Sequence, residues 1–158
     1  MKPPESTSFF DLPTDGDARH EAAIDIFGRH LFAIRNSVAA SIRANVNAPQ
    51  ESRNQMGRLH RVEYDAAATL SVEDREIALQ LAQKSVDLFI QWLLTLFQCN
   101  GLSTDLKAGD QHAIAYEVLL TFIRNDDLEP IETHTVNKDG EKIISEYFGR
   151  WLHRYGKE

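Results

Sequence analysis

Apolar residues recur every three or four positions over the first third of the chain. After Asp17 they stand at Ile24, Phe27, Leu31, Ile34, Val38 and Ile42. This spacing gathers them on one side of an α-helix, whereas Pro49 lacks the backbone N–H that a helix interior requires. The pattern therefore predicts one long amphipathic helix from about residue 17, ending at or just before Pro49.

A second helix is predicted after Pro49. Its apolar positions form a weaker stripe among many charged residues, namely Met56, Leu59, Ala66, Ala67 and Leu70. Arg61 and Asp65 are spaced for an ion pair between residues i and i+4, which suits the outer side of a helix. We expect this helix to be largely solvated.

A third helix is predicted from Ser71 to the helix-stop pair Asn100-Gly101. Ser71 and Asp74 form a capping-box pattern, with Asp in place of the more common Glu. The second half of this helix, from Phe89 to Phe97, is apolar nearly all round. We therefore expect the third helix at the centre of the fold, covered by several other elements.

The periodicity changes from about four to two beyond Gly101. Every second residue is apolar from Ile114 to Phe122, and the turn-rich RNDDLEP separates this run from the threonine-rich IETHTV. Such alternation predicts two strands joined as a β-hairpin. A helix through Ile114, Val118 and Phe122 is the competing interpretation, because periodicity resolves the two poorly over so short a run.

Aromatic residues near the C-terminus fall on one side of a final helix, predicted from about Lys142. They are Tyr147, Trp151 and Tyr155, at positions i, i+4 and i+8. Arg150 and Arg154 lie along another side. Because the chain as a whole is acidic, we interpret the rings as a face that docks on the apolar half of the third helix. Stacking on nucleic-acid bases is the less favoured interpretation.

These elements predict a predominantly helical α+β protein. Three long helices, arranged around a central apolar helix, are joined by a small β-hairpin and a C-terminal helix; an all-α bundle is the alternative. The 158 residues are enough for one domain with its own core, so we expect a single domain over residues 1–158. Residues 1–14 are expected to form an irregular tail, in which Phe9 and Phe10 either pack on the core or await a partner.

Composition narrows the choice of partner. The chain has 17 Lys and Arg against 24 Asp and Glu, a net charge of −7, which disfavours nucleic acid and favours a basic or neutral protein. Its single cysteine, Cys99, excludes an intrachain disulfide framework and indicates a reducing compartment. No apolar run resembles a signal peptide or reaches the roughly 18–20 residues that span a bilayer. We therefore expect a cytoplasmic protein with no membrane contact.

Recognisable catalytic and metal-binding patterns are scarce. Neither glycine-rich phosphate-binding loop is present. Cys99 falls at the predicted C-terminal end of a helix, where the negative pole disfavours a thiolate. Asp17 with His20 and His60 with Glu63 are spaced to share a helix face, but a carboxylate-bridged dimetal site requires a larger set. We expect no enzyme activity, no bound metal and no cofactor.

One short stretch suggests an alternative. Arg53-Asn54, followed by His60, resembles the Arg-x4–6-His motif of HEPN-type ribonucleases. The resemblance covers eight residues and implies a helical enzyme that dimerises to assemble its site, with Arg53 and His60 acting on RNA. Gly57 interrupts the helix on which that motif would lie.

The most suggestive feature is a group of carboxylates in the hairpin region. They are Asp126, Asp127, Glu129 and Glu132, and Arg124 is the one cation nearby. Charges in a turn commonly serve solvation alone, but on an ordered loop they can steer and bind a basic surface. We interpret the four as partner-binding residues of an inhibitor, of the immunity or antitoxin type, that binds a basic protein such as a nuclease toxin. A ribonuclease and a structural homodimer that pairs through the first helix are the alternatives.

Overall fold

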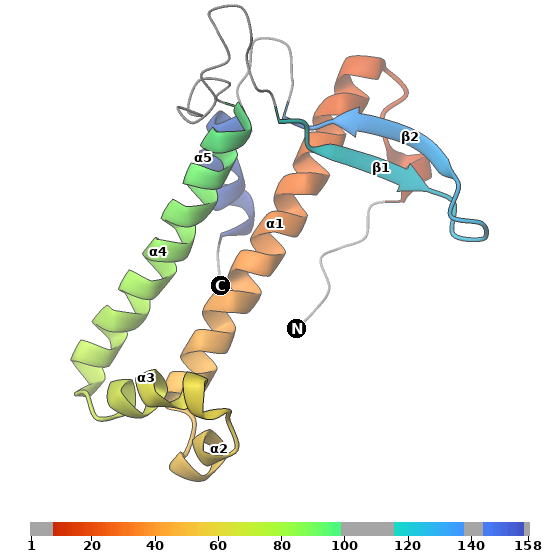
Figure 1. The fold of residues 1–158 in the computed structure, drawn as a ribbon. Helices are drawn as coiled ribbons and strands as arrows, with labels where there is room; N and C mark the ends of the chain where they lie inside the picture. Colours follow the sequence, from red (N-terminus) through yellow and green to blue (C-terminus); the bar gives the residue numbers. More distant parts are fainter. Residues whose placement is uncertain (1–7, 99–115, 138–143, 157–158) are drawn as a thin grey trace, which may run out of the picture. The chain divides into compact units, whose positions relative to one another are not determined.

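The computed structural model of the protein describes residues 8–98, 116–137 and 144–156. Its elements in chain order are η1 (Phe9–Asp11), α1 (Gly16–Asn47), α2 (Gln50–Asn54), α3 (Arg58–Ala68), α4 (Val72–Gln98), β1 (Leu119–Ile123), β2 (Pro130–Thr135) and α5 (Ile144–Tyr155) (Figure 1). The predicted α+β fold, mostly helical with one small hairpin, is confirmed. None of the described helices combines the length and apolar character needed to cross a membrane. Cys99 and the predicted stop at Asn100-Gly101 lie outside the described residues.

The chain groups into two compact units, which we treat separately. One comprises residues 1–33 and 90–158, and the other residues 34–89. Helices α1 and α4 contribute residues to both units. The single domain expected over residues 1–158 stays a prediction.

In the unit of residues 1–33 and 90–158, the hairpin is antiparallel. Its register pairs Leu119 with Thr135 and Phe122 with Glu132, and shifts before Ile123. Because successive side chains alternate between faces, Phe122 and Glu132 share the half-buried face of the hairpin, whereas Thr121 lies on the exposed face. The predicted hairpin is confirmed, and the competing helix is wrong.

In the same unit, α5 packs on the first half of α1. Trp151 is fully buried and meets Phe27 edge to face, with 6.0 Å between the ring centroids. Phe148 meets Phe32 with 5.5 Å between centroids. The predicted docking face is confirmed, but these ring contacts are with α1 and not with the apolar half of α4.

Polar contacts border the α1–α5 contact. Arg150 pairs with Glu21, and Arg154 pairs with Asp25, so the basic rim of α5 faces carboxylates on α1. The Tyr155 hydroxyl donates to Asp25 at 2.6 Å. Partial burial and the Asp25 carboxylate raise the pKa of Tyr155, so the phenol remains a donor at neutral pH.

In the unit of residues 34–89, the second half of α1 and the first half of α4 are joined by two ion pairs. Arg35 donates to both carboxylate oxygens of Asp87, at 2.7 and 3.0 Å. Arg43 binds Glu76 in the same bidentate way, at 2.7 and 2.9 Å. Arg43 follows Arg35 along α1, whereas its partner Glu76 precedes Asp87 along α4. The two segments therefore run antiparallel.

Two short helices replace the single second helix expected from the sequence. α2 ends at Asn54, and α3 begins after Gly57, whose ψ of 141° is extended. A glycine favours this break because it weakens a helix interior. The predicted pair of Arg61 and Asp65 does form within α3, at 3.2 Å.

The junction between α3 and α4 has the predicted cap. The Asp74 backbone N–H donates to the Ser71 hydroxyl oxygen at 3.1 Å, and that hydroxyl donates to the Asp74 carboxylate at 2.6 Å. Arg75 reaches back to the Ala68 carbonyl at 2.8 Å, at the end of α3. A cation at a helix C-terminus satisfies carbonyls that lack intrahelical partners.

The expectation that other elements cover the apolar second half of α4 is wrong. Ile90 and Leu94 are buried, but Phe89 and Trp92 keep about two-thirds of their surface exposed, 67% and 68% respectively. The sequence pattern shows which sides of a helix are apolar. It does not show how many neighbouring elements are present to cover those sides.

We expect Gly28→Ala to destabilise the protein by about 1–3 kcal/mol or more, because a Cβ at residue 28 would overlap the buried Trp151 indole. Gly149→Ala is the matched control, since an added Cβ meets nothing within 4 Å there. That change should stabilise α5 by about 1 kcal/mol through helix propensity. Urea unfolding measures both, and equal effects would contradict the packing of α5 on α1.

Candidate functional site

The loop between β1 and β2 is ordered by its own backbone. The Arg124 N–H donates to the Glu129 carbonyl, and the Leu128 N–H donates to the Arg124 carbonyl, each at 2.9 Å. The Asp127 side chain accepts from the Glu129 N–H at 3.1 Å. We call residues 124–129 the hairpin tip.

The structure brings together three of the four carboxylates that the sequence singled out. Asp126, Asp127 and Glu129 are exposed at the hairpin tip, where Arg124 pairs with Asp127 at 3.0 Å. Glu132 lies in β2 and is half-buried. It therefore belongs to a different environment from the other three.

Glu132 connects the hairpin to α1. The Arg19 Nε donates to both carboxylate oxygens, at 2.8 and 2.7 Å, and the His134 Nε2 donates to one of them at 2.7 Å. Partial burial acts to raise the pKa of Glu132, but hydrogen bonds from Arg19 and His134 outweigh it and hold the pKa below the ordinary 4.5. The group is therefore an ionised anchor at neutral pH.

A pair of histidines extends this anchor. The Nδ1 atoms of His20 and His134 lie 3.2 Å apart. A carboxylate is only an acceptor, so the His134 Nε2 carries a proton. The sequence had grouped His20 with Asp17 as a possible metal pair. Within residues 8–98, 116–137 and 144–156, no group of three or more potential ligands could hold a metal ion.

Aromatic contacts complete the attachment. Phe9 lies against Phe122 of β1, with 5.3 Å between centroids, and the Arg19 guanidinium stacks over the Phe9 ring at 4.6 Å. Phe10 remains 93% exposed. Of the two outcomes considered for these phenylalanines, packing on the fold holds for Phe9.

Sequence reasoning missed Leu128. Its φ is 60°, and it is the one non-glycine residue with positive φ among the described residues. Its side chain is 67% exposed. Glycine and asparagine usually occupy this left-handed conformation, so residue type gave no signal for it.

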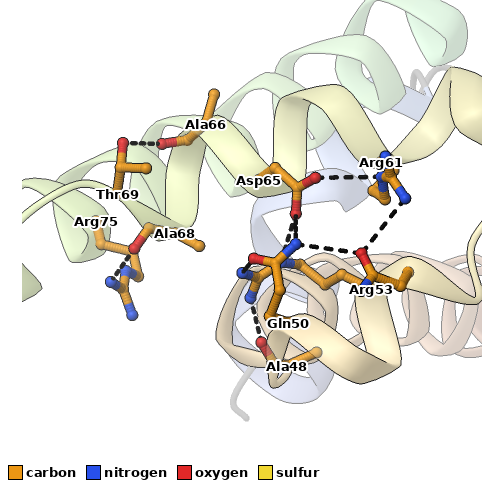
Figure 2. A network of polar contacts seen from close by, with 10 residues as sticks. Ala48, Gln50, Arg53, Arg61, Asp65, Ala66, Ala68, Thr69 and Arg75 are labelled. Carbon is orange, nitrogen blue, oxygen red and sulfur yellow. Dashed lines mark hydrogen bonds and ion pairs between the residues drawn. The ribbon is translucent and has the colours of Figure 1, made fainter.

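Arg53, the first residue of the ribonuclease-like motif, is bound within a structural network (Figure 2). It is buried, its Nε donates to Asp65 at 2.9 Å, and its other nitrogens donate to Gln50 and to the Ala48 carbonyl. The hydrogen bonds from Arg53 and Gln50 hold the pKa of Asp65 below its ordinary value. The guanidinium thus joins α2 to α3, and the side chain of His60 lies outside the described part.

Comparison with protein family models, curated proteins and solved structures finds no match for this chain. A fold class alone does not determine function. The function must therefore be argued from the hairpin and its attachment.

We expect Glu132→Gln to lower the free energy of unfolding by about 1–2 kcal/mol near neutral pH, because it removes the charge-assisted bonds from Arg19 and His134. The depressed pKa makes this contribution present above about pH 4.5 and lost as pH falls through the folded-state value. The difference between variant and wild type should therefore shrink towards pH 3. Urea unfolding across this range measures it.

Glu76→Gln is the control for this experiment. Glu76 also accepts bonds from an arginine, but both partners are more exposed, at 45% for Glu76 and 38% for Arg43. Solvent screens such a pair, so its loss should cost less. A larger effect at Glu76 than at Glu132 would contradict the anchoring role.

Proposed function

We propose that the protein acts by binding a basic protein through the hairpin tip, as an inhibitor of the immunity or antitoxin type. The observation that carries this proposal is Leu128, an exposed apolar side chain in a left-handed backbone conformation, set among Asp126, Asp127 and Glu129. We take its partner to be a protein with a basic surface around an apolar pocket, such as a nuclease toxin.

The strained backbone at Leu128 suggests that its side chain has a function. Left-handed backbone costs a side chain such as leucine about 1–2 kcal/mol, and glycine at the same position would avoid that cost. At 67% exposure, the leucine gains little burial in return. Strained residues concentrate where a side chain is needed for binding, and an apolar residue surrounded by charges is typical of an interface anchor within a polar rim.

The charges determine what kind of partner suits the tip. Arg124 offsets Asp127, which leaves Asp126 and Glu129 as the excess negative charge of residues 124–129. Carboxylates attract the same arginines and lysines that bind phosphate, so a bound tip would compete with nucleic acid on a nuclease surface. This competition is the inhibitory mechanism that we propose.

The contacts that attach the hairpin to the rest of the unit favour affinity of the hairpin tip for its partner. Arg19 and His134 bind Glu132, and Phe9 packs on Phe122, so the strands that carry the tip are held against α1 before any partner arrives. A surface ordered in advance loses less conformational entropy on binding. In this proposal Glu132 positions the tip, while Asp126, Asp127 and Glu129 contact the partner.

The remaining parts of the proposal follow from composition. One cysteine suits a reducing compartment, and we place the inhibitor in the cytoplasm. A net charge of −7 suits a basic protein as partner and opposes a role on nucleic acid or on anionic membranes.

Charge reversal tests the proposal. We expect the tagged wild-type protein to capture a partner from its own lysate at low salt and to release it at high salt. The triple variant Asp126→Lys, Asp127→Lys and Glu129→Lys should not capture this partner. Mass spectrometry identifies the retained protein. Undiminished capture by the variant would exclude the tip as the contact surface.

A second triple variant controls for net charge. Glu51→Lys, Glu63→Lys and Glu146→Lys make the same change at exposed helical positions outside the hairpin. This variant should still capture the partner. If both triple variants lose it equally, the overall charge and not the hairpin tip governs binding.

Leu128→Gly separates binding from stability. We expect the variant to be more stable by about 1 kcal/mol, because glycine adopts positive φ without strain, and yet to bind the partner more weakly. Urea unfolding and the same capture assay measure the two effects. Retained affinity in the more stable variant would show that the leucine makes no contact.

A further inference from the structure

Residues 34–89 bury fewer large apolar side chains than they expose. Apart from the side chains of residues 58–60, the buried apolar residues here are Ala39, Val46 and Leu79. The exposed ones are Ile34, Val38, Val62, Leu70, Val72, Ile77, Leu81, Leu88 and Phe89. Where such side chains form a continuous surface, that surface marks an interaction site.

Part of this exposed set forms a seam on α4. Ile77, Leu81 and Leu88 are 51%, 60% and 46% exposed. At 100° per residue, they and the exposed Lys84 fall within about 60° of one another, roughly opposite the buried Leu79. Their spacings of four, three and four residues are those of a coiled-coil seam.

We propose that the part of this seam around Ile77 and Leu81 binds the same part of a second copy of the chain, with the two α4 helices antiparallel and overlapping between Asp74 and Lys84. A two-fold axis placed near residue 79 sets Ile77 of each copy opposite Leu81 of the other. The same axis sets Lys84 of each copy opposite Asp74 of the other. In an interface with two-fold symmetry each contact occurs twice, so one surface must contain its own complement.

The charges favour a second copy as the occupant. Lys84 makes no ion pair with the described residues, and Asp74 is exposed beside Glu73 on the same side of α4. In the antiparallel arrangement each lysine meets the acidic start of the other helix, so apolar residues face apolar residues and charges face opposite charges. The dimer alternative inferred from sequence used the first helix, whereas the exposed seam places the contact on α4.

The molecular mass of the full chain in solution tests the contact. Light scattering and sedimentation equilibrium over a concentration series should show a dimer for the wild type and a monomer for Leu81→Glu. Val62→Glu, which adds the same charge at a similarly exposed position on α3, should remain dimeric. Circular dichroism should show unchanged helix content, because Leu81 is exposed in the folded chain. A monomeric wild type, or a Leu81→Glu dimer, would overturn the proposal.

A charge exchange tests the antiparallel register. Lys84→Asp alone should raise the dimer dissociation constant about tenfold, because each lysine would be replaced by a carboxylate facing Asp74. Combining it with Asp74→Lys reverses both members of each pair and should restore the affinity. A double variant that associates no better than Lys84→Asp would overturn the register. Asp74→Lys removes the side-chain bond of the helix cap at Ser71 but keeps its backbone bond, which the residue-74 N–H donates to the Ser71 hydroxyl.

Discussion

A pair of helices buries only the strip along which the two helices touch, and this constraint governs residues 34–89. Ala39 on α1 and Leu79 on α4 are buried. Ile77 and Leu81 lie on the other side of α4 and stay at the surface. A helix with apolar residues on two sides is fully covered only when another element lies against its second side. In the proposed dimer, the α4 helix of the second copy would be that element.

Ion pairs define the helix contact where the apolar core is small. Arg35 is 3% exposed and binds both oxygens of Asp87, and the buried Arg53 joins α2 to α3 through Asp65. Removing one member of such a pair leaves a poorly solvated charge, which is costlier than losing an apolar contact of similar size. Slipping α1 along α4 would separate Arg35 from Asp87 and Arg43 from Glu76. The ion pairs therefore favour one register of the two helices. Apolar contacts alone specify a register weakly, because apolar surfaces can slide past one another.

Local signals account for what the sequence predicted well. The long first helix, the cap at Ser71 and the hairpin each depend on residues close together in the chain, through periodicity, capping and turn chemistry. Glu132 shows where such reasoning ends. Its neighbours in sequence suggested an acidic cluster, but its main partner, Arg19, is 113 residues away. Leu128 was missed for another reason, because its conformation is imposed by the loop and is unusual for leucine.

The two proposed surfaces, the hairpin tip and the exposed side of α4, would bind through different interactions, electrostatic attraction and apolar burial. One could therefore act without the other. In the proposed function, binding at the hairpin tip would depend on Asp126 and Glu129, so it would weaken as salt screens their attraction to a basic partner. Association through α4 depends mainly on apolar burial at Ile77 and Leu81, which salt does not screen. A dimer formed through α4 has two hairpin tips for each particle. For a target with two basic sites, the second contact is then intramolecular, so affinity rises without any new residue at the tip, provided both sites can be reached together.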